Sequence, residues 1–348
     1  MVSTLLGLNT EELRALVQEN GGPAYLGDQL AEWIYQRGVH TFHQMSNLPD
    51  GLRAQLTKEY KVGRSHIITV QRSRDGTTKL LLAMRDGAKV ETVGLPNAGF
   101  FNCCVSTQVG CPVGCVFCAT GRSGYTRNLT AGEIVEQVLA VQEWARKQAS
   151  QIDGQSCRID HVTFMGMGEP LFNYEATVKA MRLLNRELGI AMRHITVSTA
   201  GFVPGIRQLA QEKTRINLAI SLHAPTDDLR RQLVPGMTNW GVGEIIDACH
   251  EYTQQTGRRV TFEYCLLDGI NDTIAEAYGL ATVLHGLNCH VSLIPYNPVV
   301  GLAFHGSRRG NIRAFREILE NAHIPVTQRV QRGSDIDAAC GQLRQRRT

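Results

Sequence analysis

The sequence has no stretch that approaches 18 uninterrupted apolar residues, which excludes a membrane-spanning helix. Its first residues lack the basic segment and apolar run of a signal peptide, and no internal repeat or low-complexity segment is evident. Apolar residues make up 43% and charged residues 20% of the chain, which are globular values. We therefore expect a cytoplasmic protein without membrane partners, whose 348 residues hold one large and one small domain.

The C-terminal part of the chain lacks lysine but is rich in arginine. Residues 306–348 contain nine Arg, no Lys, two Glu and two Asp, a local balance of +5, whereas the whole chain carries +4. The planar guanidinium of Arg favours bidentate contacts to phosphate. Two interpretations stay open at this point: a solvated surface, or a surface that binds phosphate groups.

Three of the ten cysteines lie in one short run, Cys111-Pro-Val-Gly-Cys115-Val-Phe-Cys118. A tight loop with this spacing can place three thiolates on a [4Fe-4S] cluster and leave the fourth iron open to chelate a small molecule. The ring of Phe117 suits packing against a cofactor. A zinc site would need a fourth Cys or His at short spacing, and the nearest following His is His161. A disulfide fits less well, because ten cysteines in a chain without a signal peptide indicate metal and redox chemistry.

Hydrophobic periodicity divides the chain into four segments. Near the start, Asn9 and Glu12 resemble a capping box, and Gly21-Gly22 ends the helix that follows. Further on, Asp75-Gly76 and Asp86-Gly87 predict hairpin turns between period-two strands. The predicted segments are an N-terminal helical module (1–60), a β-hairpin linker (61–96), a core barrel (97–336) and a C-terminal segment (337–348).

From about Phe100 the pattern alternates between strand and helix, and Thr130 with Glu133 caps the clearest helix. Six consecutive βα units imply a parallel sheet with right-handed crossovers, two units short of a closed eight-unit barrel. We therefore predict an α/β protein with a partial (β/α)6 barrel. The cysteine run follows the first strand, at the carboxyl end where such folds place their chemistry. The predicted strands are 101–107, 161–166, 194–199, 216–221, 259–265 and 290–295.

The run Met165-Gly-Met-Gly168-Glu169-Pro170 follows the second predicted strand. Gly168 lets the backbone approach a ligand, and the carboxylate of Glu169 can accept hydrogen bonds from an ammonium group. Together with the cysteine run, this resembles the radical S-adenosylmethionine (SAM) enzymes, whose open iron chelates the amino and carboxylate groups of SAM. The resemblance implies a [4Fe-4S] cluster, SAM at two molecules per turnover, and an electron donor such as flavodoxin or ferredoxin. It also implies three cluster ligands: Cys111, Cys115 and Cys118.

Further segments resemble one family within this group, the adenine-C-methyltransferases of ribosomal RNA, and the likeness extends essentially over the whole chain. The matching segments are 197–199, 220–225, 293–298 and 335–343. Taken singly, a serine at a strand end is usually a cap, and a lone histidine is usually a satisfied core or surface residue. Their shared position at strand ends, together with the resemblance, implies a set of SAM contacts: Ser198, Ser221, Leu222, His223 and Asn297.

The resemblance also gives two distant cysteines a role in catalysis. It makes Cys340 a methyl carrier, whereas the residue type alone would suggest a buried structural thiol. Adjacent strand residues face opposite sides, so only one of Cys103 and Cys104 can point toward the site, and the pattern does not say which. The family motif Cys-Val-Ser-x-Gln selects Cys104, which would release the product by forming a disulfide with Cys340. The remaining cysteines are interpreted as structural: Cys157, Cys249, Cys265 and Cys289.

Glu91, in Lys89-Val-Glu-Thr-Val93, matches the position that the family gives to a proton acceptor. The structural alternative is an exposed strand glutamate paired with a neighbouring lysine.

The function implied is methylation of carbon 2 of an adenine in the peptidyl-transferase region of 23S rRNA, with tRNA as an open second substrate. The base must be unstacked to reach a buried radical. A related family methylates carbon 8 of the same adenine and confers antibiotic resistance; residues 332–335, residues 295–297 and the N-terminal module favour carbon 2. An iron–sulfur RNA-binding sensor without turnover is a further alternative. The resemblance makes the N-terminal helical module an RNA-binding domain, and phosphate contacts are expected from it, from the β-hairpin linker and from the Arg-rich C-terminal third. The arginines of this last group are Arg308, Arg309, Arg313, Arg329 and Arg332.

Overall fold

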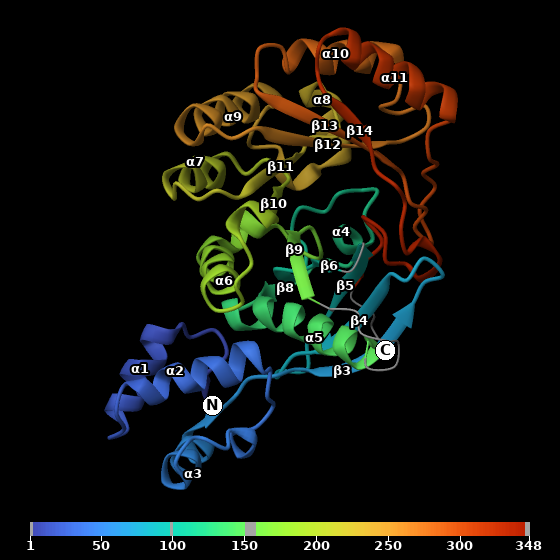
Figure 1. Ribbon diagram of the computed structural model, residues 1–348. Coiled ribbons are helices and arrows are strands. Elements are labelled where there is room, and N and C mark those ends of the chain that lie inside the picture. The colour runs from blue at the N-terminus through green and yellow to red at the C-terminus, as the bar shows by residue number, and fades with distance from the viewer. Residues whose placement is uncertain (1–2, 98–99, 150–157, 345–348) are drawn as a thin grey trace.

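The computed structural model describes residues 3–97, 100–149 and 158–344. Its centre is a ten-stranded sheet in the order β14-β13-β12-β11-β10-β9-β6-β5-β4-β3 (Figure 1). From β6 to β14 neighbouring strands are parallel, whereas β3 to β6 pair antiparallel. The strands are β3 (His66–Arg72), β4 (Thr78–Ala83), β5 (Lys89–Asn97), β6 (Phe100–Cys104), β9 (Arg158–Phe164), β10 (Ile195–Thr199), β11 (Asn217–Ser221), β12 (Val260–Leu266), β13 (Cys289–Pro295) and β14 (Val326–Gln328).

The α/β class is confirmed, and each of the six predicted strands is present. The parallel part has a seventh strand, β14, which the sequence analysis missed. It is only three residues long and buries only Val326, so it carries no readable alternation. The sheet stays open, with β14 and β3 at its two edges.

Helices connect the parallel strands, and the longer ones among them cover the outer face of the sheet (Figure 1). They are α4 (Ala119–Arg122), α5 (Ala131–Ala149), α6 (Tyr174–Arg186), α7 (Val203–Gln211), α8 (Asp227–Leu233), α9 (Val242–Thr256), α10 (Ile274–Val283) and α11 (Arg309–Asn321), with 3-10 turns η3 (Pro170–Asn173), η4 (Met192–His194), η5 (Pro235–Met237) and η6 (Ser334–Ile336). The predicted cap of α5 is present: the Glu133 amide donates to Thr130 Oγ1 at 3.2 Å, and the Thr130 amide donates to Glu133 Oε2 at 2.9 Å. In the described part of the chain, no helix is long and apolar enough to cross a membrane.

The N-terminal part of the chain is built mainly of helices and lies at one end of the sheet (Figure 1). Its elements are β1 (Ser3–Thr4), α1 (Thr10–Glu19), α2 (Tyr25–Ala31), η1 (Glu32–Gln36), η2 (Phe42–Gln44), α3 (Asp50–Glu59) and β2 (Tyr60–Lys61). The capping box of Asn9 and Glu12 is present. Buried Arg64, just after the module, pairs with Glu136 at 2.6 Å and Glu143 at 2.9 Å on α5. These ion pairs tie the end of the module to the barrel.

Strands β3, β4 and β5 turn at the two predicted Asp-Gly pairs and extend the core sheet through the pairing of β5 with β6. The C-terminal segment returns to these strands after β14. The Gly333 amide donates to Asp75 Oδ2 at 2.9 Å, and the Arg344 amide donates to Glu91 Oε2 at 2.9 Å. This return places the segment containing Cys340 over the carboxyl end of β6.

Candidate active site

The three-cysteine run forms a loop framed by a small antiparallel pair, β7 (Gln108–Gly110) and β8 (Tyr125–Asn128). Gly110 has φ +80°, and a Cβ there would lie 1.9 Å from the Gly124 carbonyl oxygen, so this crossing requires glycine. Cys111, Cys115 and Cys118 line one cavity, together with Phe117. The loop therefore presents all three predicted ligands to a shared space.

The residues of this loop fit an iron–sulfur cluster better than a zinc ion. Burial raises the pKa of Cys111 to about 12 and also raises those of Cys115 and Cys118, so ionised sulfurs here need a compensating positive centre. The three sulfur atoms do not all lie within 4.8 Å of one another. Zinc–sulfur bonds of about 2.3 Å would bring tetrahedral ligands to about 3.8 Å, which is much closer. Three spaced thiols on one cavity suit a larger inorganic cluster.

Gly168 and Glu169 lie in the loop that follows β9, the second of the predicted strands. Gly168 has φ +102°, and a Cβ would lie 2.6 Å from the side chain of Gln108, so the close approach is to this chain itself. Buried Glu169 accepts hydrogen bonds from the amides of Ala200, at 2.7 Å, and Leu171, at 3.1 Å. Burial raises its pKa to about 7, although these donors favour the charged form. Glu169 lines the same cavity as the three cysteines.

The next strand ends add Ser198, Ser221 and His223 to this cavity. The two serine Oγ atoms lie 3.2 Å apart across β10 and β11. His223 has φ +62°, and its Nδ1 accepts from the Cys265 amide at 3.0 Å. Burial lowers the pKa of His223 to about 3, so the ring is neutral. Leu222 does not share this placement: its side chain lies in the hydrophobic core, which leaves only its backbone for a ligand.

A second cavity adjoins the first and is lined by Cys104, Asn297 and Cys340. Cys340 and Cys118 line both cavities. Buried Asn297 donates from Nδ2 to the Cys340 carbonyl at 3.1 Å, and its Oδ1 has no hydrogen-bond partner among the described residues. The two cysteines of the implied pair are therefore brought together from opposite ends of the core, beside the cluster loop.

Comparison with known proteins matches residues 105–281 to the radical SAM superfamily and residues 3–62 to a ribosomal RNA large subunit methyltransferase N-terminal domain. The chain is also 48% identical over 347 residues to a protein of Gloeobacter violaceus named probable dual-specificity RNA methyltransferase RlmN, covering 99% of this chain and 96% of that protein. The chain belongs to the RlmN family of radical SAM RNA methyltransferases.

Two further relatives agree with this family. A protein of the same name from Thermosynechococcus vestitus is 45% identical, with 98% of each chain covered. The crystal structure of a radical SAM methyltransferase from Sphaerobacter thermophilus is 44% identical, has a TM-score of 0.93, and covers 99% of this chain and 100% of its own. Radical SAM enzymes use SAM and a [4Fe-4S] cluster. The cavity lined by the three cysteines fits such a cluster. Membership favours the enzyme over the non-catalytic sensor.

The other cysteines of this RlmN-family chain are placed as follows. Cys103 lies in the core, so Cys104 is the member of the pair that reaches a cavity. Cys249 and Cys289 are also core residues, whereas Cys265 lines the first cavity, which its interpretation as structural did not anticipate. All cysteines in the described part of the chain are free thiols, including Cys104 and Cys340, so no disulfide joins them here. Cys157 lies outside the described residues.

Glu91 is buried and lines neither of the two cavities. Its Oε1 pairs with Lys79 Nζ at 3.1 Å, and its Oε2 accepts from the Arg344 amide at 2.9 Å. Lys79 Nζ also donates to the Asp337 carbonyl at 2.9 Å. The role of base stays a prediction, and these contacts favour a structural role in which Glu91 and Lys79 anchor the C-terminal segment. The pair is buried, not exposed as the structural alternative supposed.

Two charged residues of the site were not singled out for it by the sequence. Glu263 lies on β12, and Arg329 directly follows β14; both line the first cavity. Glu263 and Cys265 are two residues apart and share one face of β12, a period-two signal that could have pointed to Glu263. Arg329 was predicted to contact phosphate, but it pairs with Glu263 at 2.8 Å. The other predicted phosphate contacts are exposed: Arg308, Arg309, Arg313 and Arg332.

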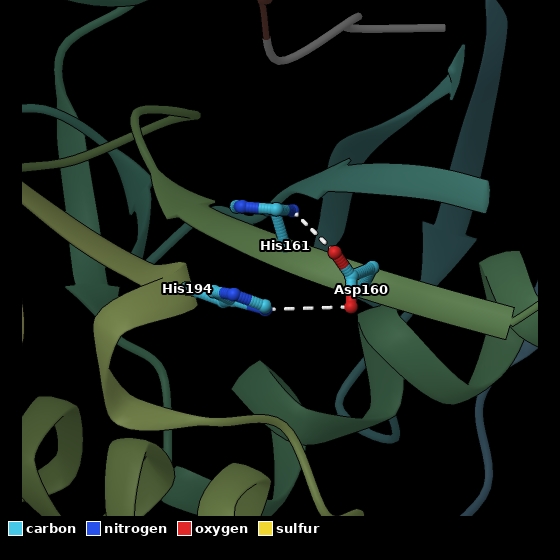
Figure 2. Close-up of side chains that lie close together, drawn as sticks. All are labelled: Asp160, His161 and His194. Atoms are coloured by element: carbon cyan, nitrogen blue, oxygen red, sulfur yellow. Dashed lines mark ion pairs between the residues drawn. The ribbon is translucent and has the colours of Figure 1, made fainter. Parts of the chain in front are cut away.

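Another polar cluster lies toward the amino ends of β9 and β10, away from the two cavities (Figure 2). Asp160 forms ion pairs with His161 Nδ1 at 2.9 Å and with His194 Nδ1 at 3.3 Å. The two rings stack with centroids 4.2 Å apart and planes 14° apart. Because the two ring planes are nearly parallel and stacked, one ion cannot lie in both planes, as ligation by both rings would require. The cluster is therefore explained as one carboxylate shared by two imidazoles.

Proposed function

We propose that this enzyme methylates carbon 2 of an adenine in 23S rRNA, and an adenine in tRNA, through a methyl group carried on Cys340. The names of its relatives, which include ribosomal RNA and dual specificity, support RNA as the substrate. Its site of action would be the cytoplasm, and flavodoxin or ferredoxin would supply electrons. When bound, the cluster and two SAM molecules per turnover would supply the methyl group and a hydrogen-abstracting radical.

The chemistry of the target explains why a thiol carrier is needed. Carbon 2 of adenine is electron-poor and has no lone pair, so it cannot displace a methyl group from a sulfonium. A methyl group first placed on a thiol can lose a hydrogen atom and add to the ring as a carbon radical. To leave a thioether, the adduct must then give up the ring proton and one electron, which the bound cluster would accept. The observation that carries the proposal is the shared cavity of Cys104 and Cys340 beside the cluster loop.

Cys104 is the thiol that would release the product. Its sulfur attacks the Cys340 sulfur in the thioether to the base; the S–S bond forms as the carbon–sulfur bond breaks. The electron pair stays on the departing carbon, which takes up a proton to complete the methyl group. Burial raises the pKa of Cys104 to about 12, so it stays a neutral thiol until it reacts, when its proton can pass to the departing carbon. The resulting disulfide must then be reduced before the next turnover.

Mass spectrometry of nucleosides tests this function. Unmodified 23S rRNA and tRNA transcripts are treated with reconstituted enzyme, SAM and a reductant, then digested to nucleosides. The expected product is 2-methyladenosine in both RNAs. If 8-methyladenosine is the main product, the enzyme belongs with the carbon-8 methyltransferases; if tRNA remains unmodified, the second substrate is withdrawn.

A further inference from the structure

Arg329 stands between the two cavities and lines both of them. Its amide donates to the Leu293 carbonyl at 2.9 Å, which continues the pairing of β14 with β13 and fixes the backbone. From there the guanidinium reaches Cys340: Nη1 lies 3.6 Å from Sγ. The side chain therefore projects from the last strand of the sheet onto the sulfur at the cavity junction.

Three further contacts hold the guanidinium in this orientation. Nη2 lies 2.8 Å from Glu263 Oε1 and 3.5 Å from Met165 Sδ, and Nε lies 3.3 Å from Ser292 Oγ. Glu263 is buried, and its Oε2 has no hydrogen-bond partner in the described part of the chain. A buried carboxylate left without its cation is costly, so Glu263 holds Arg329 firmly. Burial alone would lower the pKa of Arg329. The neighbouring Cys340 and Glu263 outweigh burial, so the pKa is raised above its usual value and the guanidinium stays charged.

We propose that Arg329 is a positioning residue that orients the Cys340 sulfur and pairs with its negative charge when it accepts a methyl group. The inference rests on the proposed function, in which Cys340 is the carrier. In that step a carbon–sulfur bond forms on Cys340 as the sulfonium carbon–sulfur bond breaks, its electron pair stays on the departing sulfur, and the thiol proton leaves to solvent. The sulfur gains negative charge as its proton leaves, and the guanidinium fixed 3.6 Å away is placed to pair with that charge. Once methylated, the neutral sulfur no longer attracts the guanidinium, which frees the methyl group for the next step.

The test measures the reactivity of Cys340 in cluster-containing protein without SAM. Iodoacetamide is added at fixed pH, and the rate of Cys340 alkylation is followed by peptide mass spectrometry. We expect Arg329→Gln to slow alkylation about tenfold, since it removes a charge-assisted contact, and Arg329→Lys to restore part of the rate. The control is Arg316→Gln, which removes an exposed partner of Glu320 on α11 and should leave the rate unchanged.

The direction of the change separates the proposal from a purely structural role. Loosening of the C-terminal segment would expose the sulfur and speed alkylation, whereas loss of the charge slows it. An unchanged or faster rate in Arg329→Gln would overturn the inference, as would a lysine variant no faster than the glutamine variant. Iron content and thermal unfolding verify that each variant is folded, and Glu263→Gln, which releases the guanidinium from its anchor, should give a smaller slowing if Arg329→Gln does not fold.

Failure of the underlying function has a different signature. Wild-type enzyme incubated with SAM should carry a methyl group on Cys340, seen as a mass increase of that peptide. If wild-type Cys340 stays unmethylated, the carrier role itself is wrong. If wild-type Cys340 is methylated but the alkylation rates do not depend on Arg329, only the positioning role is wrong.

Discussion

The two adjoining cavities of this enzyme are built in different ways. The first cavity, which we call the cluster cavity, collects most of its residues from successive strand ends in chain order, from Cys111 to Cys265. The second cavity, which we call the carrier cavity, is instead lined by Cys104 on β6 and by Cys340 near the end of the chain. The first is a product of the repeated βα unit, which delivers every loop to one edge of the sheet. The second depends on the C-terminal segment folding back onto β3 to β6. Variants in the two cavities should therefore fail at different steps.

The largest effect is expected from the cluster cavity. Replacing Cys115 with Ala removes one of the three proposed protein ligands, so iron content, brown colour and reductive cleavage of SAM should all be lost. Iron analysis, visible absorbance and detection of 5′-deoxyadenosine measure these. Cys265→Ala is the matched control, because Cys265 lines the same cavity on β12 and should leave iron in place. A Cys115→Ala protein that still cleaves SAM would show that the ligand assignment is wrong.

The carrier cavity should fail later in the reaction. Cys340→Ala should bind its cluster but transfer no methyl group, and no protein–RNA species should accumulate. Cys104→Ala should instead trap RNA covalently on Cys340, because only release is blocked. A denaturing gel with labelled RNA separates the outcomes. Normal release of methylated RNA by Cys104→Ala would remove this thiol from the mechanism.

The same contrast explains how far the sequence could be interpreted. Cys111, Cys115 and Cys118 form a spaced motif, and Ser198 and Ser221 end strands that periodicity places side by side, so their common cavity could be predicted. The contacts of Glu91 could not, because they depend on where the chain near Arg344 returns in space. Arg329 was misjudged for a related reason: its basic neighbours are exposed, and only tertiary pairing with Glu263 shows that it faces inward. Local patterns predict the strand ends, whereas long-range closure requires the structure.

Glu169 makes the cluster cavity sensitive to pH. With a pKa of about 7, its carboxylate is mostly protonated at pH 6 and mostly ionised at pH 8. Only the ionised form attracts the SAM amino group, so affinity for SAM should rise by up to about tenfold across this interval. Equilibrium binding to enzyme with an oxidised cluster measures it. Glu169→Gln should bind more weakly, with a flat profile.

Glu169 also makes the unfolding free energy depend on pH in the absence of SAM. Its pKa in the folded protein lies above the usual value of 4.5 for a glutamate, so its contribution to stability is fully present below pH 4.5 and is lost as pH rises through about 7. The unfolding free energy of the wild type should therefore fall relative to Glu169→Gln over this window, as measured by denaturant unfolding. An equal pH dependence in both proteins would contradict the raised pKa.

The smallest expected effect is the best test of whether the two cavities act independently, because it should be confined to the cluster cavity. Ser198→Ala removes one hydroxyl from the wall of the cluster cavity and leaves Ser221 Oγ without its neighbour at 3.2 Å. Loss of a single neutral hydrogen bond is worth about 1 kcal/mol, so affinity for SAM should fall about fivefold. Iron content and the alkylation rate of Cys340 without SAM should stay at wild-type values, since neither depends on this hydroxyl.

Ser307→Ala is the control: it removes a hydroxyl that donates to Asp272 at 2.6 Å outside both cavities, and it should bind SAM normally. A Ser198→Ala protein with unaltered SAM binding but altered Cys340 reactivity would mean that the two cavities act as one.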